Sequence, residues 1–344
     1  KYSPARKLFD VITNNELQWN KMDDNYDRII FPDQQFNFIA PRSQFIEQIV
    51  EYFPGSKRKI LEYLNQIDES VKSSQKYFGN KALPKLLSKI TYMPMTNKYF
   101  KYSNKTTKEV IMNIFNDKKI LGVLTGQWGD YGLPPGESSF AMHAMVVRHY
   151  LDGASYPIGT SRRISETASN YLESLGGELY VNAEVDEIIV HKNKAIGVRL
   201  SSGDEINAST IISSTGVINT YKQHLRNYSD IDTLNKNLIN INPTGSYLCL
   251  YMGINKSIHS LGISNTNLWV YPGYDHDKNV KLYNSNSDSQ LPLVYISFPS
   301  AKDPSFMKKY PDHATMEAIT ISKWKDYNRW KHLPWKNRGE EYEK

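Results

Sequence analysis

Short apolar runs separated by polar breaks characterise the first forty residues of the chain. Two of these runs, Ile29-Ile30-Phe31 and Phe36-Asn37-Phe38-Ile39, lie on either side of Pro32-Asp33. Branched and aromatic residues favour strands, whereas proline and aspartate favour turns. The pattern therefore predicts two short strands near the start of the chain.

From residue 43 onward, apolar residues recur three and four positions apart, which is the spacing of amphipathic helices. Helices are predicted over residues 43–53, 60–71, 106–115, 139–151 and 161–175. Thr106 and Glu109 have the spacing of a capping box, in which each side chain binds the backbone N–H of the other residue. Gly176-Gly177 is expected to end the last helix, because glycine adopts the left-handed conformation found there.

The period changes again near residue 178, where alternating residues indicate strands. Strands are predicted over residues 178–182, 185–191, 195–200, 209–213, 247–252, 268–271 and 293–298. The turn pairs Lys192-Asn193 and Ser202-Gly203 predict a β-meander over 185–207. We expect the meander to lead into strand 209–213, and that strand to join a parallel sheet. The polar stretch 275–290 is expected to be an exposed loop.

Residues 83–95 combine an apolar stripe with flanking lysines. Leu86 and Ile90 lie on the stripe, and Lys85 and Lys89 lie beside it. Such a segment either packs against a core or lies in the interface of a membrane. The core is the favoured interpretation, because apolar stripes are how ordinary helices pack.

The chain as a whole has 344 residues and a formal net charge of +6. Its length suits about two domains. No stretch approaches the roughly 18 apolar residues that a membrane span needs. Basic residues are scattered along the chain in short clusters, so the charge does not favour a nucleic-acid partner.

Cysteine and histidine offer no metal chemistry in this sequence. Cys249 is the single cysteine, which excludes an intrachain disulfide and a cysteine-cluster metal site. It lies between two leucines and is expected to be a small buried residue in a reducing, intracellular protein. His143 and His149 are six residues apart, so they do not share the helix face that a metal pair needs. We expect ordinary surface or half-buried histidines and no metal.

Three glycine-bearing segments are candidates for chemistry. Residues 126–136 contain four glycines, two prolines and two aromatic residues. This segment is either a rigid connection or a loop that lines an apolar ligand cavity, because glycine permits close approach and aromatic rings offer flat apolar area. The turn 153–159 precedes a helix, and a glycine-bearing turn there can present backbone N–H groups to a phosphate. The run 211–216 leads from branched residues to glycine, which would allow a cofactor to lie against bare backbone.

These segments, taken in order, resemble a known family. The blocks WGDYGLPP, SSFAMHAMVVRHYLDGASYPIG, LGGELYVNAEVDEIIVHKNKAIGVRLSSGDEI, IISSTG and FPSAKDPSF, with DVITNNELQWNKMDDNYDRIIF near the start, are similar to those of FAD-dependent retinol saturases and carotenoid desaturases or isomerases. The resemblance implies a flavin-dependent oxidoreductase that saturates, desaturates or isomerises conjugated double bonds of a lipophilic polyene or isoprenoid. It implies FAD as cofactor, with NAD(P) as a candidate electron donor or acceptor.

The chain departs from the family in two places. The family usually has a glycine pair where this chain has Gly159-Thr160, and its G-x-G-x-x-G dinucleotide motif occurs nowhere in the 344 residues. We therefore expect a fragment that is inactive alone. The expected fold class is α/β: a partial, two-layer, Rossmann-like FAD-binding domain with a mixed sheet-and-helix substrate domain. Residues 1–150 and 221–344 are assigned to the substrate domain and 151–220 to the FAD-binding domain.

The resemblance also implies roles for individual residues. Asp130 or Tyr131 is the implied proton source, and the implied substrate contacts are Trp128, Tyr131 and Tyr156. The implied cofactor-binding residues are Gly159, Val185, Ser214, Thr215 and Gly216. The backbone of Val185 would meet the adenine, and the three small residues would lie beside the dinucleotide.

An alternative interpretation remains open at this level. The chain would then be a non-catalytic lipid-binding or interaction module derived from such an enzyme. For the favoured interpretation, the expected partners are a lipophilic small-molecule substrate and, as an option, a membrane in peripheral contact, with no nucleic acid and no obligate protein partner.

Overall fold

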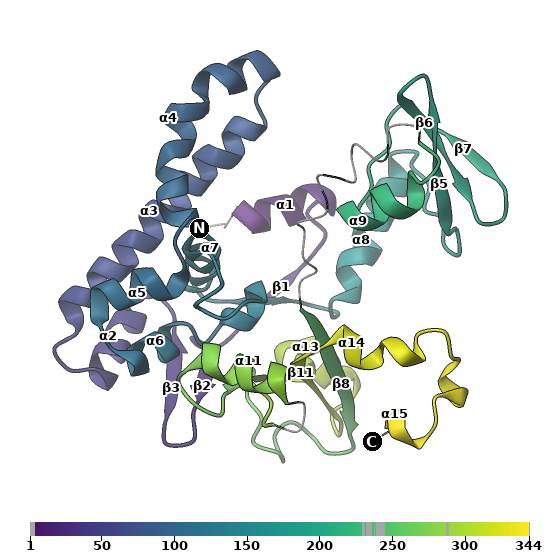
Figure 1. The fold of residues 1–344 in the computed structure, drawn as a ribbon. Coiled ribbons are helices and arrows are strands. Elements are labelled where there is room, and N and C mark those ends of the chain that lie inside the picture. Colours follow the sequence, from purple (N-terminus) through teal and green to yellow (C-terminus); the bar gives the residue numbers. More distant parts are fainter. Residues whose placement is uncertain are drawn as a thin grey trace. The chain divides into compact units, whose positions relative to one another are not determined.

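The chain folds into two compact units in the computed structural model (Figure 1). The structure describes residues 4–228, 231, 236, 238, 245–286 and 289–343. The first unit comprises residues 1–167 together with 245–344, and the second comprises residues 168–244. The chain passes from the first unit to the second within helix α8 (Arg162–Ser174).

A six-stranded mixed sheet organises the first unit. Its strands, in spatial order, are β3 (Gln35–Ile39), β2 (Asn25–Ile30), β9 (Asn267–Val270), β10 (Val294–Ser297), β11 (Ala314–Ser322) and β8 (Ser246–Ile254). Strands β2 and β9 run parallel, and the other neighbouring pairs run antiparallel. Strands β1 (Trp19–Lys21) and β4 (Ser155–Pro157) form a separate antiparallel pair. Mixed α/β architecture is therefore confirmed.

Helices from both parts of the chain complete the first unit. The N-terminal helices are α1 (Pro4–Ile12), α2 (Arg42–Tyr52), α3 (Lys57–Lys81), α4 (Lys85–Ser103), α5 (Thr107–Phe115), α6 (Lys118–Leu124) and α7 (Phe140–Tyr150). The C-terminal helices are α11 (His276–Ser285), α12 (Pro299–Lys302), α13 (Pro304–Lys309), α14 (Trp324–Tyr327) and α15 (Glu340–Glu343). Ile60, Leu64 and Ile67 of α3 are fully buried in the core that the helices share with the sheet.

Several helix ends predicted from the sequence agree with the structure, although the helix predicted over 60–71 is longer, at Lys57–Lys81. The helix over 106–115 starts with the predicted capping box: Glu109 N donates to Thr106 Oγ1 at 3.1 Å, and Thr106 N donates to Glu109 Oε2 at 2.7 Å. The helix over 161–175 ends before Gly176, whose φ is +81°. Local sequence signals at helix ends were therefore sufficient here.

The expected loop over 275–290 is wrong for most of its length, because His276–Ser285 is helix α11. Asp275 caps this helix by accepting a hydrogen bond from Lys278 N at 3.1 Å. Val280 and Tyr283 bury one side of it. The segment is polar because it contains the helix cap and the side of the helix that faces solvent. Residues 287 and 288 lie outside the described residues.

The second unit contains the predicted β-meander. Strands β5 (Val185–His191), β6 (Lys194–Leu200) and β7 (Glu205–Asn207) form an antiparallel sheet in this order. A single-turn helix, α9 (Val217–Asn219), continues into a π-helical turn, η2 (Thr220–His224). Lys192 and Asn193 have φ values of 48° and 61°, as the predicted tight turn requires.

The strands expected over 178–182 and 209–213 are wrong, and so is the parallel sheet that 209–213 was expected to join. Neither segment pairs with any strand among the described residues. Val181 and Ile212 are among the most exposed apolar residues of the chain. A β-branched run becomes a strand only where a neighbour satisfies its backbone hydrogen bonds, and none is paired with these runs.

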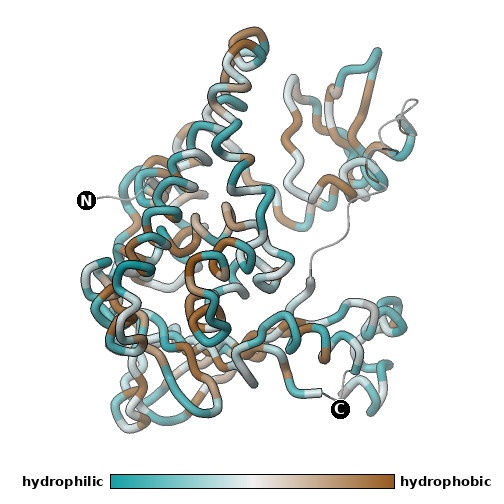
Figure 2. The backbone as a smooth tube through the Cα atoms, turned by 60° about the vertical axis from the view of Figure 1, so that its left-hand side comes forward, coloured by the Kyte–Doolittle hydropathy of each residue, from teal (hydrophilic) through white to brown (hydrophobic). Residues whose placement is uncertain are grey.

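The interpretation of residues 83–95 as a core helix is also wrong. Helix α4 forms there, but Leu86, Leu87, Ile90 and Met93 are exposed. Brown, apolar segments lie at the end of the α3–α4 hairpin in Figure 2. Among the described residues, no helix is long and apolar enough to span a membrane.

Candidate active site

The glycine-rich loop that follows α6 lies directly on the central sheet. A Cβ atom at Gly126 would come within 2.6 Å of Ile29 Cγ2, and one at Gly129 within 2.7 Å of Trp269 Cζ3. Glycine is required at both positions, because any side chain would collide with the sheet. The loop contains a short 3-10 turn, η1 (Trp128–Tyr131), which carries the predicted catalytic residues.

The sheet face next to this loop is buried at the β3 edge and exposed at the β8 edge. The strand register aligns one apolar side chain from each strand on this face, in the order Phe36, Ile29, Trp269, Tyr295, Ile319 and Cys249. The first three are fully buried, the next two are half-buried and Cys249 is exposed. We call the half from Tyr295 to Cys249 the open sheet face. The predicted burial of Cys249 is wrong, because β8 is an edge strand with few neighbours.

Asp130 lies at the border of the open sheet face. Its carboxyl group hydrogen-bonds to Tyr150, and Tyr247 of β8 donates a hydrogen bond to the carbonyl of Gly129 at 2.9 Å. Asp130 is exposed by its accessible surface, whereas its carboxyl group lies among many protein atoms that displace water from around it. This burial, followed by the negative charge of Asp27, raises the pKa of Asp130 to about 7. An acid with this pKa holds its proton in about half of the molecules near neutral pH.

Tyr131 belongs to a buried hydrogen-bonded row with a histidine at its centre. The Tyr131 hydroxyl lies 3.1 Å from His143 Nδ1, and the Tyr63 hydroxyl lies 2.7 Å from His143 Nε2. Burial lowers the pKa of His143 to about 3, so its ring is neutral and one tyrosine donates while the other accepts. His143 is fully buried, which corrects the expected surface or half-buried position.

A second polar row lies in the sheet beside Asp130, and the sequence analysis did not find it. Asp27 accepts hydrogen bonds from Gln127 Nε2 at 2.5 Å and from Asn267 Nδ2 at 2.8 Å. Lys302 Nζ donates to Asn267 Oδ1 at 2.6 Å and to Ser297 Oγ at 2.5 Å. Burial lowers the pKa of Lys302 to about 8 and raises the pKa of Asp27.

A sequence signal for this second row was available but unspecific. Asp27 and Lys302 each stand within a block on which the family resemblance rests. They are 275 positions apart, and only the pairing of β2 with β9 brings their common neighbour Asn267 between them. Charged residues in strands and short helices are usually exposed, so the sequence alone did not identify Asp27 and Lys302 as buried residues of a site.

The remaining substrate residues occupy different environments. Tyr156 of β4 lies under Lys302, whose Nζ is 5.7 Å from the centre of the tyrosine ring. Trp128 is only 1% exposed and its ring packs 6.2 Å from that of His276. Trp128 therefore supports the loop from the core side, whereas Asp130 and Tyr131 lie toward the sheet and α7.

Gly159 precedes α8 with a φ of +91°, and its N–H donates to Asp303 Oδ2 at 3.1 Å. Asp303 is buried and also caps α13. The N–H of Gly159 is thus already used within the chain. Thr160 follows with a φ of +71°, a conformation that favours glycine and explains the glycine pair that the family resemblance leads one to expect.

The other residues assigned to cofactor binding belong to the second unit. Val185 starts β5, which is an edge strand of its sheet. Ser214, Thr215 and Gly216 are exposed. A Cβ atom at Gly216, where φ is +89°, would have no atom of another part of the chain within 4 Å. Ser213 Oγ lies 3.0 Å from Thr215 Oγ1 and 2.7 Å from Thr220 Oγ1, which orders the turn.

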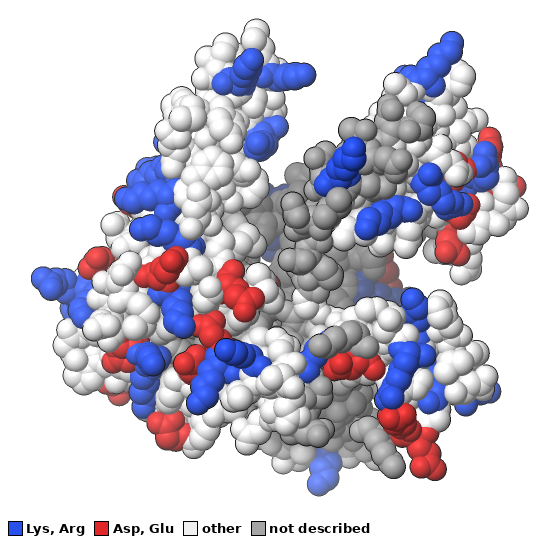
Figure 3. Space-filling model, viewed as in Figure 1, with Lys and Arg blue, Asp and Glu red and all other residues white. Residues whose placement is uncertain are grey.

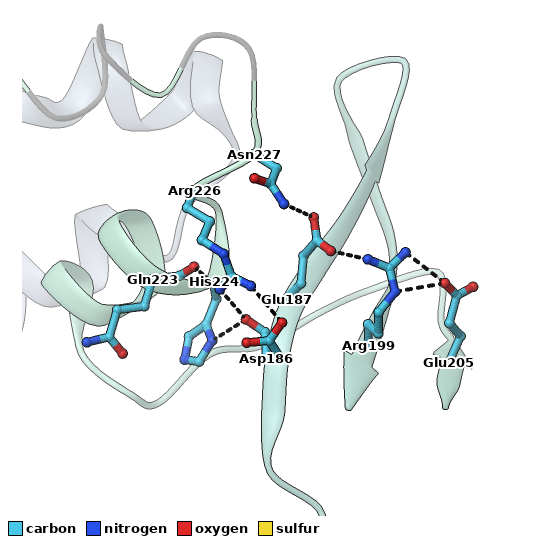
Figure 4. Close-up of polar contacts among 8 residues, drawn as sticks. All are labelled: Asp186, Glu187, Arg199, Glu205, Gln223, His224, Arg226 and Asn227. Carbon is cyan, nitrogen blue, oxygen red and sulfur yellow. Dashed lines mark hydrogen bonds and ion pairs between the residues drawn. The ribbon is translucent and has the colours of Figure 1, made fainter. Parts of the chain in front are cut away.

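A network of ion pairs holds β5 to the turn that follows η2 (Figure 4). Arg226 Nη2 contacts Asp186 Oδ2 at 2.6 Å, and Asn227 Nδ2 contacts Glu187 Oε1 at 3.0 Å. Arg199 of β6 binds Glu187 on its other side. The strand that starts with Val185 is thus fixed within its unit. Among the residues that the structure describes, no group of three or more potential metal ligands is present.

The arrangement of strands and helices is similar to that of proteins of known structure. A putrescine oxidase structure superposes on 96% of this chain and 66% of its own, with a TM-score of 0.54 and 13% identity. A protein from Pyrococcus furiosus matches 92% of this chain and 65% of its own, with a TM-score of 0.57 and 15% identity. At these identities the likeness concerns the fold.

Comparison with curated protein sequences gives more specific relatives. An all-trans-retinol 13,14-reductase of Danio rerio is 27% identical over 99% of this chain, and a protein of the same species named an inactive all-trans-retinol 13,14-reductase is 25% identical over 97%. A prolycopene isomerase of an Oncidium hybrid cultivar is 23% identical over 86%. The resemblance predicted from the sequence is thereby confirmed.

The chain spans only part of these relatives. It covers 59% of the length of the first reductase, 58% of the second and 49% of the isomerase. No family model matches the chain.

Proposed function

We propose that this chain provides the substrate-binding part, and a portion of the FAD-binding part, of a flavin-dependent oxidoreductase. Its substrate would be a lipophilic polyene or isoprenoid, and the reaction would saturate, desaturate or isomerise a conjugated carbon–carbon bond. The observation that carries the proposal is the position of Asp130, whose pKa is about 7, at the border of the open sheet face. Relatives named for retinol and prolycopene support the substrate class.

The chain's own residues have separable tasks in this proposal. Tyr295, Ile319 and Cys249 offer apolar area on which a flat polyene would lie and from which it would exclude water. Asp130 would hold a proton on its carboxyl group for transfer to or from the polyene carbon chain. Tyr131 and His143 would keep the loop in place. FAD, when bound, supplies hydride or electron transfer.

The second unit is the proposed site of the adenine end of FAD. An edge strand leaves one side of its backbone outside the sheet, which suits recognition of adenine by the main chain of Val185. The exposed Ser214-Thr215-Gly216 turn leaves room for a ligand against its backbone. We keep residues 151–220 as the proposed contribution to the FAD-binding domain and the remainder as the substrate domain.

The electron partner and the location of the protein complete the proposal. NAD(P) stays a prediction from the family resemblance. An intracellular protein in peripheral contact with a membrane would meet a substrate that partitions into lipid, and the single cysteine agrees with a reducing compartment. No obligate protein partner is proposed.

Polyene binding by the chain tests the substrate site. All-trans-retinol is titrated into the protein, and its fluorescence and quenching of protein emission report binding. Cys249→Asp places a charge on the open sheet face and is expected to weaken binding at least tenfold. Leu250→Asp is the matched control, because Leu250 is exposed on the opposite face of the same strand. Equal affinities of the two variants would refute the assigned face.

The acid role of Asp130 needs a turnover assay. In a protein that carries these residues together with a complete FAD-binding segment, Asp130→Asn is expected to lower kcat by about 10²–10⁴-fold with a smaller effect on KM. Glu137→Gln is the control, since Glu137 is an exposed carboxylate on the same loop. Unchanged turnover of Asp130→Asn would make Asp130 a structural residue.

A second candidate is a non-catalytic polyene-binding module. The relative that is named an inactive retinol reductase favours keeping this candidate. It predicts retinol binding that Cys249→Asp weakens, but no turnover by a flavin-loaded protein of full length. The two assays together therefore separate the candidates.

A further inference from the structure

The outer end of the α3–α4 hairpin exposes apolar side chains that ordinary helices bury. We call residues 78–93 the hairpin tip. Leu86, Ile90 and Met93 lie at positions i, i+4 and i+7 of α4 and are 71%, 67% and 61% exposed. Phe78 and Leu87 are also more than half exposed. Among the described residues of the chain, this is a continuous apolar stripe on a helix with nothing packed against it.

The charge around the hairpin tip has one sign. No aspartate or glutamate occurs from Ser70 to Lys108, whereas nine lysines occur there. Lys81, Lys85 and Lys89 are the lysines of the tip itself, and all three are exposed. Blue lysine side chains and no red acidic ones mark the end of the hairpin on the face shown in Figure 3. The combination of exposed apolar residues with flanking lysines is typical of helices that lie in an anionic membrane interface.

The hairpin tip is an ordered surface. Asn80 is fully buried in the turn, where its Nδ2 donates to the carbonyl of Ser88 at 3.0 Å and to Thr91 Oγ1 at 2.9 Å. Ser88 Oγ returns a hydrogen bond to Asn80 Oδ1 at 3.1 Å. These hydrogen bonds hold the apolar stripe in place in the free protein. Binding would therefore lose little conformational entropy.

We propose that the hairpin tip docks into the headgroup region of an anionic membrane surface. Leu86, Ile90 and Met93 would enter the boundary between headgroups and acyl chains, and Lys85 and Lys89 would contact lipid phosphates. An apolar protein partner would explain the stripe but not the long acid-free stretch of lysines around it. This docking deepens the peripheral membrane contact of the proposed function by naming the surface that makes it. Its test does not use the flavin chemistry, so its failure is distinguishable from a failure of polyene turnover.

Vesicle sedimentation of the intact chain tests this docking. We expect the protein to bind phosphatidylcholine vesicles that contain phosphatidylserine and to bind pure phosphatidylcholine weakly. Leu86→Gln combined with Ile90→Gln is expected to abolish binding. The control pair is Leu172→Gln with Leu175→Gln, two exposed leucines, one in α8 and one directly after it. Wild-type affinity of the tip variant would overturn the proposal.

The lysines are tested by their effect on the salt dependence. Each lysine near an anionic surface contributes roughly fivefold to affinity, so Lys85→Gln with Lys89→Gln is expected to weaken binding about thirtyfold and to flatten its dependence on salt. Lys308→Gln with Lys309→Gln, two exposed lysines of α13, is the control. Equal losses in both pairs would mean that net charge, and not the tip, binds the vesicle.

A fluorescent probe distinguishes insertion from contact between proteins. Ile90→Cys in a Cys249→Ser background carries a single thiol for an environment-sensitive dye. A blue shift on addition of anionic vesicles supports docking. A shift that appears without vesicles and grows with protein concentration would show that the tip is an interface between copies of the chain, and the proposal would fail.

Discussion

Gly129→Ala is expected to destabilise the protein, because the loop that carries Asp130 leaves no room for a side chain. The added Cβ would lie 2.7 Å from Trp269 Cζ3 and 3.3 Å from its Cη2. The indole is only 2% exposed and packs 4.6 Å from the ring of Tyr295, so it has little freedom to move aside. Either the loop lifts from the sheet or the indole leaves its rotamer.

The expected magnitude combines two opposing effects. Overpacking a core costs about 1–3 kcal/mol. Replacing glycine with alanine also restricts the unfolded chain, which stabilises the folded state by about 0.4–1 kcal/mol where the backbone is compatible. The clash is larger than the entropy effect, so we expect a net loss of about 1–2 kcal/mol in the free energy of unfolding.

Urea denaturation followed by tryptophan fluorescence measures this loss. Gly253→Ala is the matched control, because nothing lies within 4 Å of a Cβ at that position. It is expected to leave the stability unchanged or slightly raised. A double variant of Gly129→Ala with Trp269→Phe should lose less than the sum of the single variants, because the shorter ring removes the contacting atoms. An unfolding free energy of Gly129→Ala within about 0.3 kcal/mol of the wild type would refute the close packing of loop and sheet.

Three further predictions follow from the described geometry and from the sequence. Because the pKa of Asp130 is raised in the folded state, the unfolded state loses this proton at lower pH than the folded state does. The unfolding free energy of the wild type should therefore fall relative to that of Asp130→Asn as pH rises from about 4 to about 7. A constant difference between the two proteins across that range would contradict this prediction. Thr160→Gly should stabilise the protein by about 0.5–1 kcal/mol in urea, because a φ of +71° strains threonine more than glycine; a loss of stability would be inconsistent with that strain. The 344-residue chain should not retain FAD through desalting, because a few hydrogen bonds of about 1 kcal/mol each fall short of the roughly 8 kcal/mol of micromolar binding, and a stoichiometric yellow protein would disprove this.

Local signals in the sequence determined most secondary structure of this protein. The capping box at Thr106, the glycine after α8 and the turn pair Lys192-Asn193 each satisfy backbone groups within a few residues. Their energetics do not depend on distant parts of the chain, so the sequence is sufficient. The glycines of the loop with Asp130 indicated a close approach of other groups, and Gly126 and Gly129 do lie close to the sheet. The functional roles of that loop came from the family resemblance and stay a prediction.

Tertiary structure decided which apolar runs were buried. The run at Ile212 has the composition of a strand but has no partner among the described strands, and the stripe at Leu86 has the pattern of a core helix but faces solvent. Whether an apolar surface is buried depends on which other element packs against it, and the sequence of a single segment does not specify that element. Cys249 is exposed for the same reason, since it lies on an edge strand.

The candidate site shows the same division between local and distant information. Asp130 and Tyr131 lie within one short segment and were assigned through the family resemblance. The row from Asp27 through Asn267 to Lys302, in contrast, requires strands that are 240 residues apart in the chain to pair. The sequence by itself determined which residues could donate, accept or carry charge. Only the register of the sheet decided which of them meet, because hydrogen bonds and pKa shifts depend on distance and burial rather than on order along the chain.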